Sequence, residues 1–346
     1  MEITEIRVDG EFEQVVFGED PTTGYRGIIA IHSTVLGPAV GGTRLWHYAN
    51  DEEALRDALR LARGMTYKTA LAGLPLGGGK AVIIADGSPM DRESIFRSHG
   101  RFVERLGGRY ITAEDVGTSP ADMEYVRLET RHVAGLADRS GDPSLPTARG
   151  VFRAILAAAR HRWDSENLNG KTVALQGCGH VGYRLAQELH RAGAKLIAAD
   201  VDENSLRRVA QEFDARTVRP EEIFSALADI FCPCALGGIL NDETIPQLRV
   251  EIVAGSANNQ LLEARHGDAL QERGILYAPD YIANAGGVIN GGTELLGWEP
   301  AYAARKVDEI YDTVLRIFAI ARAEGIPTYL AADRLAERRL TSAGIS

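Results

Sequence analysis

Apolar and polar residues in the first part of the chain predict alternating helices and strands. The run RGIIAIHST at 26–34 indicates a strand. From residue 51, DEEALRDALRLARGMTYKTAL repeats apolar residues at helical spacing, and Asn50 with Glu53 offers a capping-box-like start. We expect this helix to end near Gly73, followed by LPLGGGK as a connection and AVIIAD as a buried strand. A helix over about 91–106 and the strand RYITAED complete the pattern.

The second part follows a candidate linker and alternates more strictly. Residues 137–147, ADRSGDPSLPT, concentrate Gly, Pro, Ser and Asp, and Thr147 offers a cap for the helix VFRAILAAARHRW. Strands and helices then follow in the order KTVALQG, GHVGYRLAQELHRAG, KLIAAD, ENSLRRVAQEF, DIFCPCA, EIVAGSA and GILYAPD. This order predicts a doubly wound parallel sheet. Two further helices, over about 299–324 and 327–340, close the chain, and we expect the last to return to the first domain.

One motif within this pattern indicates a dinucleotide. Residues 177–182 read GCGHVG, directly after the strand KTVALQ and at the start of the next helix. Gly177 permits a tight turn, Gly179 lets a pyrophosphate approach bare backbone, and Gly182 lets the helix pack closely on the strand. His180 belongs to the turn on the phosphate side, far from where the hydride is transferred, so we expect it to serve as backbone scaffold and not as a catalytic group.

An acidic residue extends the motif. Asp200 ends the strand KLIAAD, 23 residues after Gly177 (200 − 177), near the offset at which an acid meets the adenosine ribose. Because a carboxylate there repels a 2′-phosphate, we favour NAD over NADP. Asp202 and Arg207 or Arg208 lie close enough in sequence to leave this choice open.

Composition and charge narrow the classes of function. The 346 residues carry 38 basic and 48 acidic side chains, a net charge of −10 that disfavours general nucleic-acid binding. The start of the chain has no export signal, and no run of about 18 apolar residues predicts a membrane span, so we expect a cytoplasmic protein. Cys178, Cys232 and Cys234 suit neither a disulfide framework nor a zinc site.

Two lysines and an acidic pair are candidates for chemistry. Lys80 ends GGGK, but a P-loop is excluded because Leu74 occupies its first glycine position, Ala81 follows the lysine, and the order runs from helix to strand. Glu114 and Asp115 lie where a strand becomes a loop, which suits either an acid facing a cleft or a helix cap. G-x-S-x-G and H-E-x-x-H are both missing from the sequence, which excludes the corresponding hydrolases.

The segments that carry a family resemblance are GPAVGGTR, ALRLARGMTYK, LPLGGGKAVI, GRYITAEDVGT, CPCALGG, GSANNQL, YAPDYIANAGGVIN and YLAADRLAERR. On these segments, the chain resembles the glutamate/leucine/phenylalanine/valine dehydrogenase family nearly end to end. Within it, the chain is similar to the leucine, valine, phenylalanine and tryptophan branch. The resemblance implies reversible oxidative deamination of an L-amino acid to its 2-oxo acid and ammonia, with NAD as cofactor. It also implies an α/β substrate-binding and oligomerisation domain, residues 1–136 plus 327–346, and a Rossmann-type NAD-binding domain, residues 137–326.

The resemblance assigns the reacting groups. It implies that Lys68, with backbone at Gly41 and Gly42, binds the substrate carboxylate. Lys80 is implied as the catalytic lysine that polarises the carbonyl or the attacking water, and burial beside another cation is expected to lower its pKa to about 7 or 8. Asp115 is implied as the acid that exchanges a proton with the amine.

The side-chain pocket is implied by departures from glutamate-specific relatives. Val40 replaces a lysine and Gly291 a serine, so we expect an apolar pocket with Met65 on its wall and Asn259 near the substrate amine. Gly291 beside Gly292 leaves room for a bulkier side chain or for a different packing partner, and one glycine cannot decide between branched and aromatic substrates. The implied cofactor contacts are Gly177, Cys178, Gly179, His180, Val181, Gly182, Asp200, Thr147, Ala257 and Asn258. Arg149 stands where relatives place an aromatic residue, for no reason visible in the sequence.

Two alternatives stay open. One is a nucleotide-binding regulatory protein derived from the family, which is disfavoured because Lys68, Lys80 and Asp115 are all present. The other is a dehydrogenase acting on an unusual amine. The resemblance implies a homo-oligomer, either a dimer or an octamer. The expected small-molecule partners are an amino acid or 2-oxo acid and ammonia, and we expect binding to neither nucleic acid nor a membrane.

Overall fold

The computed structural model describes residues 1–8, 10, 12–87, 90–136 and 142–344. The chain divides into two compact units. Unit 1 comprises Met1–Gly141, Gly291–Trp298 and Ala336–Ser346, and unit 2 comprises Asp142–Asn290 and Glu299–Leu335. These units differ from the division expected from sequence at 291–298 and 327–335, because helices α9 (Gly286–Leu295) and α12 (Thr328–Gly344) run through the boundaries between the units.

Unit 1 is built on a mixed six-stranded sheet in the order β1-β2-β3-β5-β4-β6. Strands β4, β5 and β6 are parallel, and the remaining pairs are antiparallel. Its further elements are β1 (Glu2–Glu5), β2 (Gln14–Asp20), β3 (Tyr25–Ser33), β4 (Ala39–Trp46), α1 (Asp51–Leu71), β5 (Gly77–Ile84), α2 (Arg92–Glu104), β6 (Tyr110–Glu114) and α3 (Pro120–Arg127).

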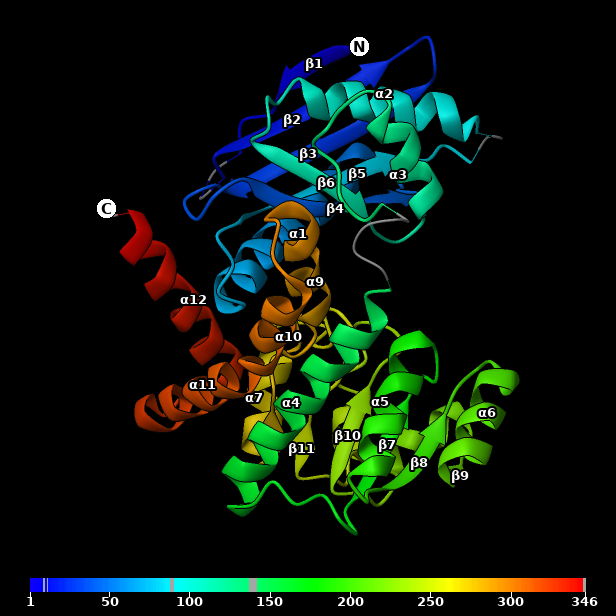
Figure 1. Ribbon diagram of the computed structural model, residues 1–346, viewed down its shortest axis with the longest axis vertical. Helices are drawn as coiled ribbons and strands as arrows, with labels where there is room; N and C mark the ends of the chain where they lie inside the picture. Colours follow the sequence, from blue (N-terminus) through cyan, green and yellow to red (C-terminus); the bar gives the residue numbers. More distant parts are fainter. Residues whose placement is uncertain (9, 11, 88–89, 137–141, 345–346) are drawn as a thin grey trace. The chain divides into compact units, whose positions relative to one another are not determined.

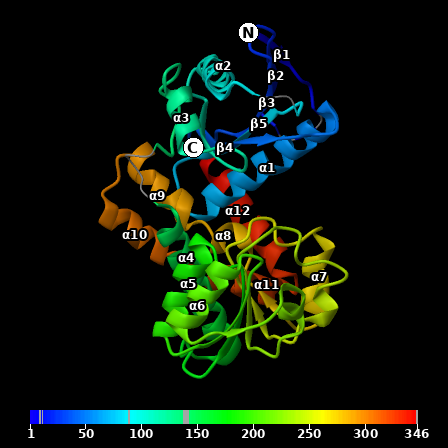
Figure 2. The ribbon, with the colours of Figure 1, turned by 90° about the vertical axis from the view of Figure 1, so that its right-hand side faces the viewer.

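Helices cover both faces of this sheet. On one face, alanines of α1 at 54, 58 and 62 pack on β2, β3 and β5, and on the other, apolar residues of α2 and α3 form a second core. Figure 2 shows α1 on one side of the strands and α2 with α3 on the other. As predicted, α1 begins at an Asn50 cap, which accepts the N–H of Glu53 at 2.9 Å, and ends just before Gly73.

The glycines of GGGK lie inside β5, so the prediction of a connection there was wrong. A Cβ at Gly78 would lie 2.0 Å from the backbone nitrogen of Thr66 in α1, and one at Gly77 would lie 2.0 Å from the carbonyl oxygen of Ser33. Because only bare backbone lets α1 approach β5 this closely, glycines occupy a central strand that their low β-propensity disfavours. This packing buries Lys80, which is 5% exposed.

The core between the sheet and α2 contains a histidine held between two hydroxyl groups. The imidazole of His99 lies 2.9 Å from Tyr25 Oη and 2.8 Å from Thr43 Oγ1. Burial lowers the pKa of His99 from 6.5 to about 3, so the folded state keeps this ring neutral.

We expect this ring to make the fold sensitive to acid. The unfolded chain binds a proton at His99 near pH 6.5 and the folded chain only near pH 3, so this contribution is complete above pH 6.5 and is lost as the pH falls. The free energy of unfolding should drop by about 2 kcal/mol between pH 6.5 and about pH 5 through this group alone. Urea denaturation at the two pH values measures it. His99→Gln should flatten the dependence, and an equally steep variant would contradict the assignment.

Unit 2 contains a six-stranded sheet in the order β12-β11-β10-β7-β8-β9, with every pair parallel. Numbered along the chain within the unit, this is the 3-2-1-4-5-6 arrangement of a doubly wound dinucleotide-binding fold, which confirms the predicted fold class. Its elements are α4 (Ser144–Trp163), β7 (Thr172–Gln176), α5 (His180–Arg191), β8 (Lys195–Ala199), α6 (Glu203–Phe213), β9 (Arg216–Thr217), η1 (Pro220–Ser225), β10 (Ile230–Pro233), η2 (Ile245–Gln247), β11 (Ile252–Val253), α7 (Arg265–Glu272), β12 (Leu276–Tyr277), α8 (Asp280–Ala283), α10 (Pro300–Asp308) and α11 (Ile310–Glu324).

Helices α4, α5 and α6 lie side by side on one face of unit 2 (Figure 1), whereas α7 packs with η1 and η2 on the core of the other face. Two local predictions were wrong. Helix α4 begins at Ser144, so Thr147 lies within it and donates its hydroxyl to the carbonyl of Pro143 at 2.7 Å. The helix expected over 299–324 is two helices that meet at Glu309. Residues 137–141 of the expected linker lie outside the described residues. None of the described helices is long and apolar enough to cross a bilayer.

Candidate active site

Strand register in unit 1 gathers the candidate substrate-binding and catalytic residues on the face that α1 covers. Val40 pairs with Gly78, and Arg44 pairs with Val82. Lys80 lies two residues from Gly78 and two from Val82 along β5, and side chains two apart on a strand share a face, so Val40, Arg44 and Lys80 lie on the same face of the sheet. Gly42 pairs with Ala113 of β6, and Asp115 follows on the same alternation. The parallel strands β4, β5 and β6 therefore present one continuous surface of candidate residues.

A buried ion pair forms the centre of this surface. Lys80 Nζ donates to Asp115 Oδ2 at 2.8 Å, and Arg44 Nε donates to the same oxygen at 3.1 Å. Among the described residues, Oδ1 of Asp115 has no hydrogen-bond partner. One carboxylate oxygen is thus held by two cations while the other remains available to a ligand.

The charges at this centre shift each other's pKa values. Burial lowers the pKa of Lys80, and the nearby Arg44 charge adds to this effect although Asp115 opposes it. Burial alone would raise the pKa of Asp115, but the charges of Lys80 and Arg44 lower it. The pair therefore joins an ionised acid to a lysine that loses its proton more readily than an exposed one, as predicted, and Arg44 is the additional cation.

Arg44 is a functional residue that the sequence reasoning missed. Its Nη1 donates to Asp57 Oδ2 at 2.9 Å, and the same oxygen accepts the hydroxyl of Tyr48 at 2.9 Å. Asp57 lies on α1, so this network ties Asp115 to the helix. The signal was present in GGTR, because Arg44 follows Gly42 by two residues and a strand would place both on one face.

Two glycines of β4 leave bare backbone beside this pair. A Cβ at Gly41 would lie 1.8 Å from the carbonyl oxygen of Gly79, and one at Gly42 would lie 2.5 Å from that of Glu114. Met65 and Lys68 lie one turn apart near the end of α1, and both are half-buried. No side chain larger than hydrogen fits at Gly41 or Gly42, which agrees with a role for their backbone.

Helix α3 shows whether Glu114 or Asp115 serves as a helix cap. Ser119 and Asp122 form the capping box of α3, so neither Glu114 nor Asp115 caps it. Burial and the Asp115 charge raise the pKa of Glu114. The Asp115 carboxylate is directed to cations, which favours the interpretation as a site acid.

The neighbouring glycines of α9 differ in their surroundings. A Cβ at Gly291 would have no atom within 4 Å, whereas one at Gly292 would lie 2.7 Å from the ring of Trp298. Trp298 is therefore the packing partner at Gly292. The open space expected from the sequence exists at Gly291 only.

In unit 2, the GCGHVG loop has the three predicted glycine environments. Gly177 has a positive φ of 94°, and a Cβ on it would lie 2.9 Å from the backbone nitrogen of Ala235. Gly179 faces open space, with no atom within 4 Å of its would-be Cβ. A Cβ at Gly182 would lie 1.9 Å from the carbonyl of Gly177. His180 and Val181 complete the first turn of α5. The loop thus exposes bare backbone at a helix N-terminus, where a pyrophosphate binds.

Asp200 follows β8 beside this loop. Its Oδ2 accepts the N–H of Cys178 at 2.5 Å, and its Oδ1 accepts that of Asp202 at 2.8 Å. Asp202 itself caps α6, and Arg208 is paired with Glu212 at 3.0 Å. Two of the nearby groups that left the choice of cofactor open, Asp202 and Arg208, therefore contact other residues of α6.

The loop after β11 holds the remaining candidates. Ala257 donates its N–H to the carbonyl of Pro233 at 3.0 Å, and Asn258 Oδ1 accepts from Asn284 Nδ2 at 2.9 Å. Asn259 is exposed and adopts a positive φ of 52°. This loop and the glycine loop both leave the carboxyl ends of strands, the edge at which doubly wound sheets bind ligands.

Arg149, unexplained in the sequence, forms surface ion pairs on α4. Its Nε lies 2.9 Å from Asp308 Oδ1 and its Nη1 3.8 Å from Glu188 Oε2. These contacts link α4 to α10 and α5. Arg149 thus has a structural role in unit 2.

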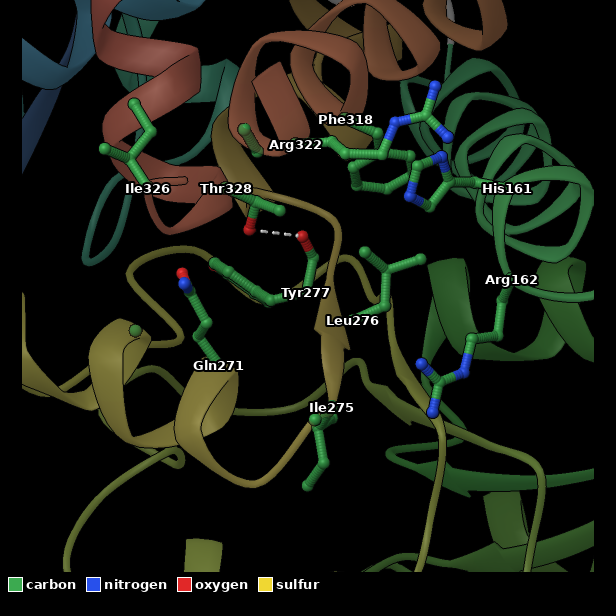
Figure 3. A pocket seen from close by; sticks show the side chains of 13 residues that line it. His161, Arg162, Gln271, Ile275, Leu276, Tyr277, Phe318, Arg322, Ile326 and Thr328 are labelled. Carbon is green, nitrogen blue, oxygen red and sulfur yellow. Dashed lines mark hydrogen bonds between the residues drawn. The ribbon is translucent and has the colours of Figure 1, made fainter. Parts of the chain in front are cut away.

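A pocket of about 220 Å³ opens elsewhere in unit 2, around the start of β12 (Figure 3). His161, Leu276 and Phe318 line it, and Thr328 donates to the carbonyl of Tyr277 at 2.7 Å along its wall. No candidate residue lines it, so it is distinct from the predicted cofactor site.

Comparison with known proteins identifies the chain's relatives. The model of the Glu/Leu/Phe/Val dehydrogenase dimerisation domain matches residues 13–132, and that of Glutamate/Leucine/Phenylalanine/Valine dehydrogenase matches residues 199–341. Leucine dehydrogenase of Geobacillus stearothermophilus is 54% identical over 343 residues, 98% of this chain and 94% of the relative. The chain belongs to the glutamate/leucine/phenylalanine/valine dehydrogenase family.

Other members of the family resemble it over similar lengths. L-tryptophan dehydrogenase of Nostoc punctiforme is 50% identical over 332 residues, 95% of this chain and 94% of the relative. The crystal structure of L-tryptophan dehydrogenase from that organism matches with a TM-score of 0.87 and 47% identity, covering 97% of this chain and 98% of that one. Residues 145–250 also match the NAD binding domain of D-isomer specific 2-hydroxyacid dehydrogenases. The family and the two-domain fold predicted from sequence are thereby confirmed.

Proposed function

We propose that the chain is an NAD-dependent dehydrogenase that reversibly deaminates an apolar L-amino acid to its 2-oxo acid and ammonia. The observation that carries the proposal is the buried Lys80–Asp115 pair, in which Lys80 and Arg44 share one carboxylate oxygen. It occurs in a family member that is half identical to leucine and tryptophan dehydrogenases along nearly its whole length.

The residues of unit 1 have distinct tasks in this reaction. Lys68 and the bare backbone at Gly41 and Gly42 bind the substrate carboxylate. Asp115 accepts a proton from the substrate ammonium at Oδ1 and later returns one to the leaving ammonia. Lys80, with its lowered pKa, removes a proton from the water that adds to the iminium carbon. As ammonia leaves the resulting carbinolamine, it takes up the hydroxyl proton and becomes ammonium, while the Lys80 cation stabilises the oxygen that becomes the carbonyl.

The residues of unit 2 fit a dinucleotide. Gly179 leaves space at the N-terminus of α5, Gly177 supplies the turn, and Asp200 lies where the adenosine ribose is read. NAD, when bound, supplies the acceptor for the hydride of the substrate α-carbon. Ala257, Asn258 and Thr147 are proposed to contact its nicotinamide half, and Asn259 the substrate amine.

Substituting Asp200 tests the preference between cofactors. Asp200→Asn keeps an oxygen acceptor for Cys178 and removes the negative charge, so we expect kcat/KM with NADP to rise about tenfold relative to NAD. Asp202→Asn is the matched control at the adjacent helix cap and should leave the ratio unchanged. Steady-state kinetics with both cofactors measure it, and an unchanged ratio in Asp200→Asn would remove Asp200 from this role.

The function itself is tested by NADH formation with L-leucine, L-valine, L-phenylalanine, L-tryptophan and L-glutamate at alkaline pH. We expect turnover of at least one apolar substrate and little of L-glutamate, because Val40 is buried at 4% exposure and offers no partner to a distal carboxylate. Silence across the panel in protein that binds NADH would instead favour the regulatory protein or an unusual amine.

We further propose that unit 1 mediates assembly of a homo-oligomer in the cytoplasm. Support comes from the match of residues 13–132 to a domain described as a dimerisation domain. Light scattering measures the number of subunits, and a monomer at micromolar concentration would contradict the proposal.

A further inference from the structure

Helix α9 carries a half-buried glutamate, Glu294, that the reaction described above does not use. Glu294 Oε2 accepts the N–H of Gly135 at 3.0 Å. Its other oxygen, Oε1, is buried and has no hydrogen-bond partner among the described residues. Leaving a buried carboxylate oxygen without a donor costs free energy, and the residues that the structure describes supply none for this atom.

The contact with Gly135 fixes where this oxygen lies. Residues before Gly135 run beside β6, with Ala134 donating its N–H to the carbonyl of Thr112 at 2.8 Å. A Cβ at Gly135 would lie 3.7 Å from Cγ of Glu114. The Glu294 carboxylate is therefore anchored at the end of β6, where the catalytic candidate Asp115 follows.

Helical spacing brings this oxygen next to open space. Gly291 and Glu294 are three residues apart on α9, so they are neighbours on its surface. The surroundings of Gly291 hold no atom within 4 Å of a would-be Cβ, whereas the ring of Trp298 occupies the corresponding space at Gly292. Room for a bulky group and a buried acceptor thus occur on the same turn.

We propose that Glu294 is a specificity determinant that accepts, through Oε1, a hydrogen bond from an N–H or O–H group on a bulky substrate side chain. The inference rests on the proposed function, and it takes Gly291 as the pocket position that the family resemblance implies. An aliphatic side chain leaves Oε1 unpaired, whereas an indole, phenol or ammonium donor satisfies it. A site built to accept a hydrogen bond discriminates strongly against analogues that lack the donor.

Three matched pairs of substrates test the inference: L-tryptophan with 1-methyl-L-tryptophan, L-tyrosine with L-phenylalanine, and L-lysine with L-norleucine. We expect kcat/KM to favour the donor-bearing member at least about tenfold in one pair or more. A preference for the donor-bearing member that is below about tenfold in all three pairs, or reversed, overturns the inference, whatever any variant does. Turnover of none of the six, nor of L-leucine, would contradict the proposed function instead.

Variants of Glu294 separate recognition from stability. Glu294→Gln has a single oxygen, which the N–H of Gly135 already occupies, and its amide NH2 can only donate, so it should weaken the donor preference. Glu294→Val should lose the preference at least about tenfold and improve the apolar member of the pair. Glu272→Val, an exposed glutamate of α7, is the matched control and should change neither. A donor preference that survives Glu294→Val in folded protein overturns the assignment.

Discussion

Lys80→Ala should abolish turnover while the protein still folds and binds NADH. In the proposed mechanism Lys80 removes the proton of the attacking water, and it is buried against Asp115 at 2.8 Å, where solvent cannot replace it. We expect kcat to fall by about a thousandfold or more, the size of effect that loss of a positioned base and its charge produces. The variant also loses one of the two cations that lower the pKa of Asp115, so its remaining activity should require higher pH.

Single-turnover measurements of hydride transfer and NADH fluorescence separate chemistry from cofactor binding in this variant. Lys195→Ala, an exposed lysine on β8, is the matched control and should retain the full rate. Small primary amines added to Lys80→Ala should restore part of the activity, because they place an amine in the space left beside Asp115. A full rate in the variant would refute the role of Lys80.

The sequence predicts unit 2 better than unit 1, and the reason is physical. In unit 2, apolar strands and amphipathic helices alternate. The role of each glycine of GCGHVG follows from its place in the motif, so it can be predicted without knowing the rest of the fold. In unit 1, the glycines at 41, 42 and 77–79 serve contacts with distant segments. Their strands resemble loops in composition, so β4 was not predicted and GGGK was placed in a connection.

The candidate site shows the same division between local and tertiary signals. Lys80 and Asp115 were predicted through the resemblance, whereas the contact of Arg44 with Asp115 depends on the neighbouring strand and on α1. Nothing in the sequence around Glu294 marks it as a candidate site residue, because its carboxylate contacts Gly135, which lies 159 residues earlier in the chain. Domain boundaries drawn at linkers also miss α9 and α12, whose helical pattern continues through them.

Arg44→Met should damage both the stability of unit 1 and the pH dependence of the reaction. Arg44, Asp57 and Asp115 are each less than a quarter exposed, at 19%, 15% and 22% of their side-chain surfaces. Removing the cation leaves the carboxylates of Asp57 and Asp115 with fewer partners. Breaking a partly buried ion pair in this way lowers the free energy of unfolding by on the order of 3 kcal/mol. Thermal melts should show this loss, and kcat should fall by roughly a hundredfold because Asp115 is no longer tied to α1.

The sign of the pH effect follows from the charges. Burial lowers the pKa of Lys80, and the Arg44 cation lowers it further, so removing that cation raises it. The rise of kcat/KM with pH, which reports the coupled Lys80–Asp115 pair, should therefore move to higher pH in Arg44→Met. Arg44→Lys should move it less, because it keeps the charge but cannot reach Asp115 and Asp57 together with a planar fork. If folded Arg44→Met keeps the original pH profile, Arg44 acts only as a structural link between β4 and α1, and the electrostatic coupling deduced from the shared Oδ2 atom is wrong.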